Sequence, residues 1–352
     1  MDRSTNHDRP CPDCGPVATR RDFLKTGIGG LAVATAASAG LWTPGGIASR
    51  AMGADIATAV PAETLVAGLY KTLTEEQRKS ICFPFDHPLR SKVNNNWTIV
   101  DKSVGKFFTP DQQAMIRDIF LDMHSEEYAA KVMQQVEHDN SEDGGFAGCA
   151  VAMFGEPGEP GKSKFEFVFT GRHVTRRCDG NSVEGAAFGG PIFYGHAAEG
   201  FNETAKHPGN IYWYQAVRAN ELFQALDGRH RDVALRDDPR KEHGSATVEL
   251  GNRNRELSGL PVSELTHDQK DLMSKVMGDL LAPFRKADSD EAMKLIQDGG
   301  FDNLHITFYK NMDIGNDGVW DLWQVEGPAM VWFFRGAPHV HTWVHVREPE
   351  KV

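Results

Sequence analysis

The sequence predicts an α+β fold made of two halves, each a layer of helices followed by an antiparallel meander of strands. The 352-residue chain is 40% hydrophobic and 25% charged, which is ordinary globular composition and excludes a disordered or collagen-like chain. Stretches with helical periodicity precede stretches that alternate at period two, and this order occurs twice. Because runs of helices alternate with runs of strands, rather than in strict β-α-β units, the pattern favours α+β.

The first half begins with a helix from Glu63, where apolar residues recur at helical spacing. Thr74 is typical of a helix cap, and Thr109 followed by Pro110 predicts the start of a further helix. After Gly144–Gly145 the pattern changes: 149–154 predicts one strand, and 165–175 predicts a second, longer one that begins with alternating residues.

The second half repeats this order. Thr266 opens a helix as Thr109 does, and the strand pattern at Leu322 matches that at Phe165, so both pairs are 157 residues apart. We interpret the two halves, about 63–200 and 215–346, as pseudo-repeats of a diverged internal duplication. The alternative is that a similar order of helices and strands arose by coincidence. Either way, residues 55–352 are expected to form a single domain.

Residues 1–54 are predicted to be a signal peptide that is removed. Arg20 and Arg21 precede Phe23, Leu24 and a weakly apolar run, which is typical of a twin-arginine export signal. The alternative is a membrane anchor, but a run this short and rich in Gly and Ala spans a bilayer poorly. We therefore expect the twin-arginine export machinery as a partner, a periplasmic or extracellular location, and no stable membrane insertion of the mature protein.

The charge of the mature chain argues against a nucleic-acid partner. The whole chain carries 38 basic and 49 acidic residues, for a net charge of −11. Removing residues 1–54 leaves 32 basic and 45 acidic residues, so the predicted mature portion has a net charge of −13. A phosphate backbone would be repelled by such a surface.

Three cysteines remain after the signal is removed: Cys82, Cys149 and Cys178. In an oxidising compartment this number permits one disulfide and one thiol, with Cys149–Cys178 as one pairing among those available.

Histidines near the end of the chain give the sharpest chemical signal. In a strand over 338–346, His339, His341 and His345 share one face, because side chains alternate along a strand. At ~3.3 Å per residue, His339 and His341 lie ~7 Å apart, close enough for both imidazoles to bind one metal ion. His345 is ~13 Å from His341 and too far for the same ion.

A further ligand must come from a neighbouring segment. The first candidate is His173 in the long strand of the first half, the second is His196 between glycine-rich flanks, and the third is His305. Imidazole ligands suit copper or zinc. Two alternatives stay open: a structural hydrogen-bond cluster, and acid–base chemistry without a metal.

Candidate catalytic residues are Asp86, Arg90 and Arg172. Asp86 and Arg90 belong to an irregular, aromatic-rich loop that starts at Phe83. Arg172 lies beside His173 and is placed either to hold an anionic substrate or to pair with a nearby acid such as Glu166. The sequence has no Gly-x-Ser-x-Gly elbow, phosphate loop, dinucleotide fingerprint or His-Glu-x-x-His motif, which removes the commonest hydrolase, kinase and dehydrogenase interpretations.

Taken together, these segments resemble the bacterial and fungal family known as domain of unknown function 3500. The resemblance covers roughly residues 63–346 and rests on segments 73–78, 83–86 with Arg90 and Trp97, 171–174, 190–195, 265–270, 325–328 and 338–342. Members of that family typically have two adjacent histidines after the glycine at 171, and this chain has Arg172 in place of the first. The resemblance implies secretion and recurrent histidines, but it implies no reaction.

Three hypotheses for function follow. The first is an exported enzyme in which His339, His341 and His173 bind copper or zinc and act on a small organic substrate. The second is a non-catalytic exported module that binds a metal or a small ligand. In the third, the histidines have a purely structural role.

Overall fold

The computed structural model describes residues 62–158, 162–197, 209–250, 256–310 and 318–349; the predicted signal peptide, 1–54, lies outside them. In these ranges there are nine α-helices and one mixed sheet of 11 strands, which confirms the α+β class. The helices are α2 (Ala62–Thr72), α3 (Glu75–Ile81), α4 (Val104–Phe107), α5 (Pro110–Asp122), α6 (Glu126–Asp139), α7 (Trp213–Ala225), α8 (Gly228–Ala234), α9 (His267–Leu281) and α10 (Lys286–Asp298).

The strands divide between the same two halves of the chain. The first half contributes β1 (Cys82–Phe83), β2 (Ala150–Gly155), β3 (Phe165–Gly171), β4 (Val174–Cys178) and β5 (Ile192–His196). The second half contributes β6 (Leu235–Arg236), β7 (Leu260–Pro261), β8 (His305–Tyr309), β9 (Leu322–Gly327), β10 (Met330–Arg335) and β11 (Val340–Val346).

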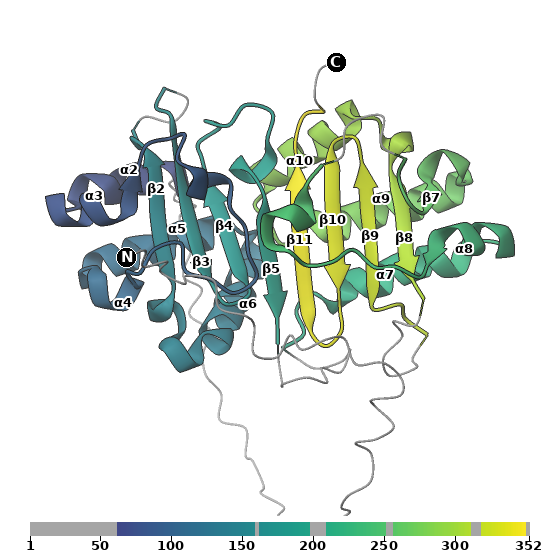
Figure 1. Cartoon of the computed structure of the whole chain (residues 1–352), viewed down its shortest axis with the longest axis horizontal. Coiled ribbons are helices and arrows are strands. Elements are labelled where there is room, and N and C mark those ends of the chain that lie inside the picture. Colours follow the sequence, from purple (N-terminus) through teal and green to yellow (C-terminus); the bar gives the residue numbers. More distant parts are fainter. Residues whose placement is uncertain (1–61, 159–161, 198–208, 251–255, 311–317, 350–352) are drawn as a thin grey trace, which may run out of the picture.

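The order of strands across the sheet is the same in both halves when it is followed outward from the centre. The sheet runs β1-β2-β3-β4-β5-β11-β10-β9-β8-β6, with β7 beside β8. Each half is an antiparallel meander with one short parallel strand at its outer edge, and β5 pairs with β11 to join them. Figure 1 shows the first half in purple and teal and the second in green and yellow. Each half thus has helices followed by a meander; their duplication from one ancestral unit stays a prediction.

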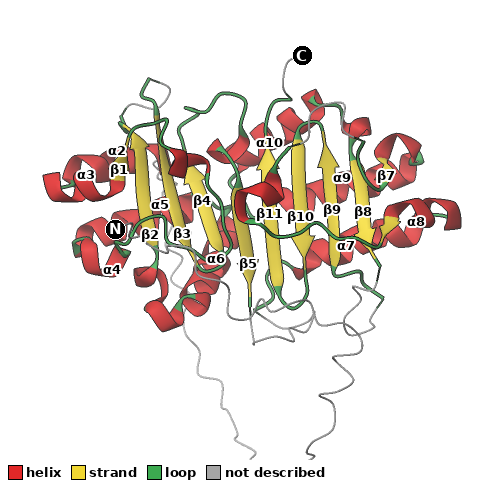
Figure 2. Ribbon diagram, in the orientation of Figure 1, coloured by secondary structure: helices red, strands yellow, loops and turns green. Residues whose placement is uncertain are grey.

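The two faces of the sheet are covered differently. Helices α5, α6, α7, α9 and α10 pack behind the strands in Figure 2, whereas loops and short helical turns cross the front. The prediction that β11 alternates between these faces is confirmed. Val340 and Val344 belong to the main hydrophobic core, whereas Trp343 belongs to a second, smaller cluster that includes Val93 and Val248 from the covering loops.

Helix starts follow the sequence signals closely. Thr74, Thr109 and Thr266 are each the N-cap of a helix, and each forms a reciprocal capping box with a glutamine three residues later. Such a box satisfies two backbone N–H groups that have no partner inside the helix. The matched threonines at 109 and 266 therefore have the same structural role.

One predicted element is wrong. The long strand expected over 165–175 is two strands, β3 and β4, which fold back on each other at Arg172 and His173. His173 has a φ of 60°, in the left-handed region, which reverses the chain direction and which a continuous strand does not contain. The alternation of residues 165–169 ends before the turn, and Gly171 is the residue next to the reversal that favours a turn.

Two further observations bear on the sequence predictions. Cys82, Cys149 and Cys178 are all free thiols, so the pairing of Cys149 with Cys178 does not occur. Among the described residues, no helix combines the length and apolar character needed to cross a bilayer.

Candidate metal centre

Three imidazole rings converge where the two halves of the sheet meet. His173 lies in the β3–β4 turn, His341 lies in β11, and His339 lies in the bend one residue before β11 rather than in the strand as predicted. The Nε2 atom of His339 is 3.0 Å from Nε2 of His173 and 3.0 Å from Nε2 of His341. All three side chains are fully buried. They form a group that could hold a metal ion.

The turn that carries His173 is held in place from both sides of the sheet. The N–H of His173 donates to the backbone oxygen of Asn95 in the covering loop, at 2.8 Å. Asn140, which follows α6, accepts from the N–H of Arg172 at 2.7 Å and donates its amide to the carbonyl of Arg172 at 3.2 Å. These contacts stabilise a backbone conformation that is otherwise unfavourable for a residue with a Cβ. They therefore fix where the ring of His173 lies.

Two carboxylates orient the outer nitrogens of His173 and His341. Asp139, the last residue of α6, lies 2.9 Å from Nδ1 of His173. Glu242, in the loop that follows β6, lies 2.9 Å from Nδ1 of His341. Metal-binding histidines commonly donate their second N–H to a carboxylate, which fixes both the tautomer and the ring orientation. Helix α6 thus supplies one carboxylate, and the loop after β6 supplies the other.

Both carboxylates are held in the ionised form. Burial by itself raises the pKa of Asp139, but the contacts with His173 and His196 outweigh it and leave the pKa below its usual value. Burial also acts against ionisation of Glu242, yet the neighbouring His341 and Arg335 bring the pKa of Glu242 to about 2. Each carboxylate is thus an acceptor at neutral pH, which requires a proton on the imidazole nitrogen that faces it.

Counting protons leaves an excess of lone pairs between the rings. A neutral imidazole carries one N–H, so His173 and His341, which donate through Nδ1, each direct an Nε2 lone pair toward His339. Nε2 of His339 holds at most one proton, yet it lies 3.0 Å from both lone pairs. Neutral rings therefore satisfy only one of these contacts by a full hydrogen bond. A cation among the three nitrogens accepts all of the lone pairs at once.

The spacing of the nitrogens also fits a metal ion. Two nitrogens bound at ~2.0–2.1 Å lie ~2.9 Å apart at a right angle and ~3.3 Å apart at the tetrahedral angle. The two separations of 3.0 Å lie within that interval. The donor set, three imidazoles with no thiolate, suits zinc or copper.

The other two histidine candidates lie apart from this group. Nδ1 of His196, at the end of β5, is 3.2 Å from the carboxylate of Asp139, so His196 contacts the acid that supports His173. His305 begins β8, and β9 and β10 separate it from β11. His345, which the sequence places too far along the strand, is bound through Nδ1 to the carbonyl of Val248.

The three candidate catalytic residues lie in two different parts of the fold. Asp86 is exposed, in the loop after the edge strand β1. Arg90 in the same loop donates to the buried carboxylate of Glu166 and to the carbonyl of Phe85, and so has a packing role. Arg172 is adjacent to His173 and is the one of the three that lies at the histidine group.

Asp139 and Glu242 are the site residues that sequence reasoning missed. Asp139 resembles an ordinary polar residue at the end of a helix, and Glu242 stands among charged residues in a loop. Neither residue lies near the histidines in sequence, so no local pattern links it to them.

The fold and the site define an α+β protein with a buried group of three histidines that is able to hold a metal ion. The family model described as "Protein of unknown function (DUF3500)" matches residues 56–351 of this chain. The chain belongs to that family. No curated protein and no solved structure matches it.

Proposed function

We propose that this chain is an exported metalloenzyme in which His173, His339 and His341 bind copper or zinc next to a position open to a small organic substrate. The observation that carries the proposal is the convergence of three Nε2 atoms, two of them from rings whose Nδ1 atoms are engaged by Asp139 and Glu242. An arrangement of this kind orients lone pairs toward one point before any ion binds.

The number of ligands favours catalysis over a structural role. Among the described residues, the possible ligand group at this site has three members. Structural zinc sites usually have four protein ligands, whereas catalytic sites have three and leave one position for water or substrate. At such a position either ion supplies a Lewis acid.

Export through the twin-arginine pathway is part of the proposal. It rests on Arg20 and Arg21 and the weakly apolar run that follows them. This pathway carries folded proteins, so an ion would be bound before or after transport without the chain unfolding. Fusion of residues 1–60 to a reporter, with Arg20 and Arg21 both changed to Lys as the control, tests it. Retention of the wild-type fusion in the cytoplasm would exclude this route.

A second function, a non-catalytic metal-binding module, is favoured by one observation. All three histidines are 0% exposed, which suits storage or stable binding of an ion better than rapid access of a substrate. The two functions differ in whether the ion has an exchangeable ligand. In cobalt-substituted protein, a change of the visible spectrum on addition of azide supports the enzyme, and an unchanged spectrum supports the module.

Metal content is the main test of the site. We expect purified wild-type protein to contain close to one equivalent of copper or zinc by elemental analysis, and His341→Ala and His341→Gln to contain almost none. The glutamine variant keeps most of the side-chain volume, so it separates loss of a ligand from loss of packing. His345→Ala, on the same strand and face, is the matched control and should retain the metal. Equal metal content in all four proteins, or none in any, would refute the proposal.

A further inference from the structure

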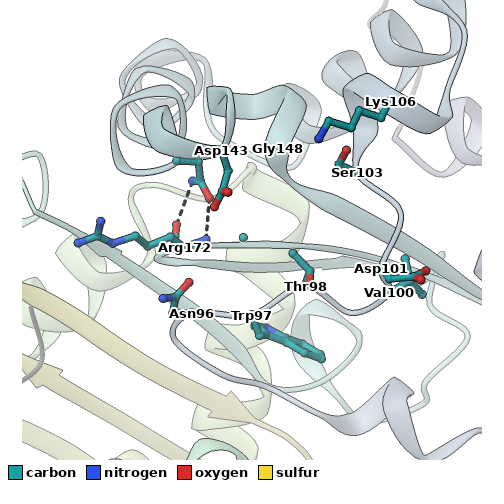
Figure 3. A pocket seen from close by; sticks show the side chains of 12 residues that line it. Asn96, Trp97, Thr98, Val100, Asp101, Ser103, Lys106, Asp143, Gly148 and Arg172 are labelled. Carbon is teal, nitrogen blue, oxygen red and sulfur yellow. Dashed lines mark hydrogen bonds between the residues drawn. The ribbon is translucent and has the colours of Figure 1, made fainter. Parts of the chain in front are cut away.

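A polar pocket opens beside the turn that carries His173. It has a volume of about 320 Å³, at the small end of the range for ligand sites. Its walls come from the covering loop at 96–103, from α4, from the end of α6 and from the β3–β4 turn. Figure 3 shows these walls around the labelled side chains.

Charges of both signs line this pocket. Lys106 and Arg172 are basic, and Asp101 and Asp143 are acidic, so the lining has no net charge. Asn96, Thr98 and Ser103 add neutral hydrogen-bonding groups. A lining of this composition gives no advantage to a polyanion or to an apolar ligand. It favours a small ligand that carries a positive and a negative group at once.

Lys106 is placed to bind the negative group of such a ligand. In Figure 3 its ammonium extends from α4 toward the side of the pocket on which Asp143 lies, while the guanidinium of Arg172 extends away from Lys106. Lys106 is exposed and forms no ion pair with any described residue. Binding of an anion by Lys106 does not require an ion pair of this lysine with a described residue to be broken.

Two residues of the pocket wall are adjacent in sequence to residues of the histidine group. Asn140 and Arg172 line the pocket, and each is the sequence neighbour of a site residue, Asp139 and His173 respectively. The amide of Asn140 forms two hydrogen bonds with the backbone of Arg172. A molecule held in this pocket therefore lies against the segment that positions one of the three histidines.

We propose that this pocket binds a small zwitterion of the α-amino-acid class, with its carboxylate on Lys106 and its ammonium on Asp143. The inference goes beyond the proposed function, because binding in the pocket requires no metal ion.

Calorimetric titration of the full chain after dialysis against a chelator tests this. The probes are L-alanine, L-serine, L-glutamate and L-lysine, with succinate and glycerol as an anion and a neutral polyol. We expect saturable binding of at least one amino acid, weakened tenfold or more in Lys106→Met and in Asp143→Asn. Lys79→Met, which changes an exposed lysine on α3, should bind as the wild type does.

The outcome is decided without reference to the metal. Binding of an amino acid that Lys106→Met abolishes supports the proposal. Absence of amino-acid binding, unchanged binding in Lys106→Met, or tighter binding of succinate or glycerol overturns it. Since the protein is metal-free throughout, none of these results depends on whether the three histidines bind an ion.

Discussion

Both halves of the sheet are joined to a covering loop by acid–base contacts, but in the second half one further acid also contacts a histidine. In the first half the acid is Glu166 of β3, and the basic partners are Arg177 of β4 and Arg90 of the covering loop. The second half has the same kind of contact, between Glu326 of β9 and Arg240 of the loop after β6. In addition, this loop supplies Glu242, which contacts Arg335 of β10 and His341 of β11.

This difference decides where a metal centre can form. Two guanidiniums neutralise Glu166 and keep no lone pair for a ligand, so that cluster only holds loop and sheet together. Glu242 instead accepts from one guanidinium, the indole of Trp343 and one imidazole. The imidazole of His341 has a second nitrogen, which faces the other histidines. An imidazole in place of a guanidinium as the partner of an acid thus changes a packing contact into support for a possible metal ligand.

The largest expected effect comes from breaking the first-half cluster. Arg177→Met leaves the fully buried Glu166 with Arg90 as its charged partner and removes hydrogen bonds to the carbonyls of Pro191 and Lys92. Loss of one partner of a buried ion pair costs about 3–5 kcal/mol. We expect a decrease of this size in the free energy of unfolding by urea.

Arg335→Met is the matched variant in the second half. It should reduce stability by less, because Glu242 is 17% exposed and keeps two donors, His341 and Trp343. An equal loss in the two variants would show that the clusters have the same role and would contradict the comparison.

A smaller effect is expected when the acid that contacts His341 is changed. In Glu242→Gln, Nδ1 of His341 faces a neutral amide in place of a carboxylate, so we expect the metal affinity to fall about 10–100-fold. Competition with a chromophoric chelator measures this. Glu249→Gln, an exposed residue of the same loop, is the control and should leave the affinity unchanged. An unaltered affinity in Glu242→Gln would mean that the carboxylate does not support the ligand.

The smallest effect concerns contact between the halves at α10. Burial, together with the nearby Asp179 and Asp288, raises the pKa of Glu291 to about 7. A group whose pKa is raised on folding contributes stability below its unfolded pKa, and this contribution is lost as pH rises through 7. Glu291→Gln should therefore raise the free energy of unfolding at pH 8 by on the order of 1 kcal/mol after solvent screening. The melting temperature should rise accordingly at pH 8 and stay unchanged at pH 4. A gain of the same size at both pH values would exclude this explanation.

Local patterns predicted much of the fold and part of the site. The capping threonines and the face of β11 that carries His341 could be predicted because each depends on residues a few positions apart. The turn at His173 could not, since Gly171, which precedes the reversal, is equally compatible with a bulge in one continuous strand.

The carboxylate partners depend on contacts that no local pattern contains. Asp139 is 34 residues from His173, and Glu242 is 99 residues from His341. The aromatic-rich composition of the loop around Asp86 has a packing explanation, because the guanidinium of Arg90 lies 4.4 Å above the ring of Phe85. The catalytic roles of Asp86 and Arg90 stay predictions.

The position of the three histidines has a consequence for how the molecule comes apart. His173 and His339 are 166 residues apart and belong to opposite halves, which the β5–β11 pairing also joins. An ion held by both would act as a removable link across this junction and, because it binds the folded chain, would stabilise the folded state. The loaded protein would then unfold more slowly than the bare one, and its resistance to proteolysis would depend on the supply of metal.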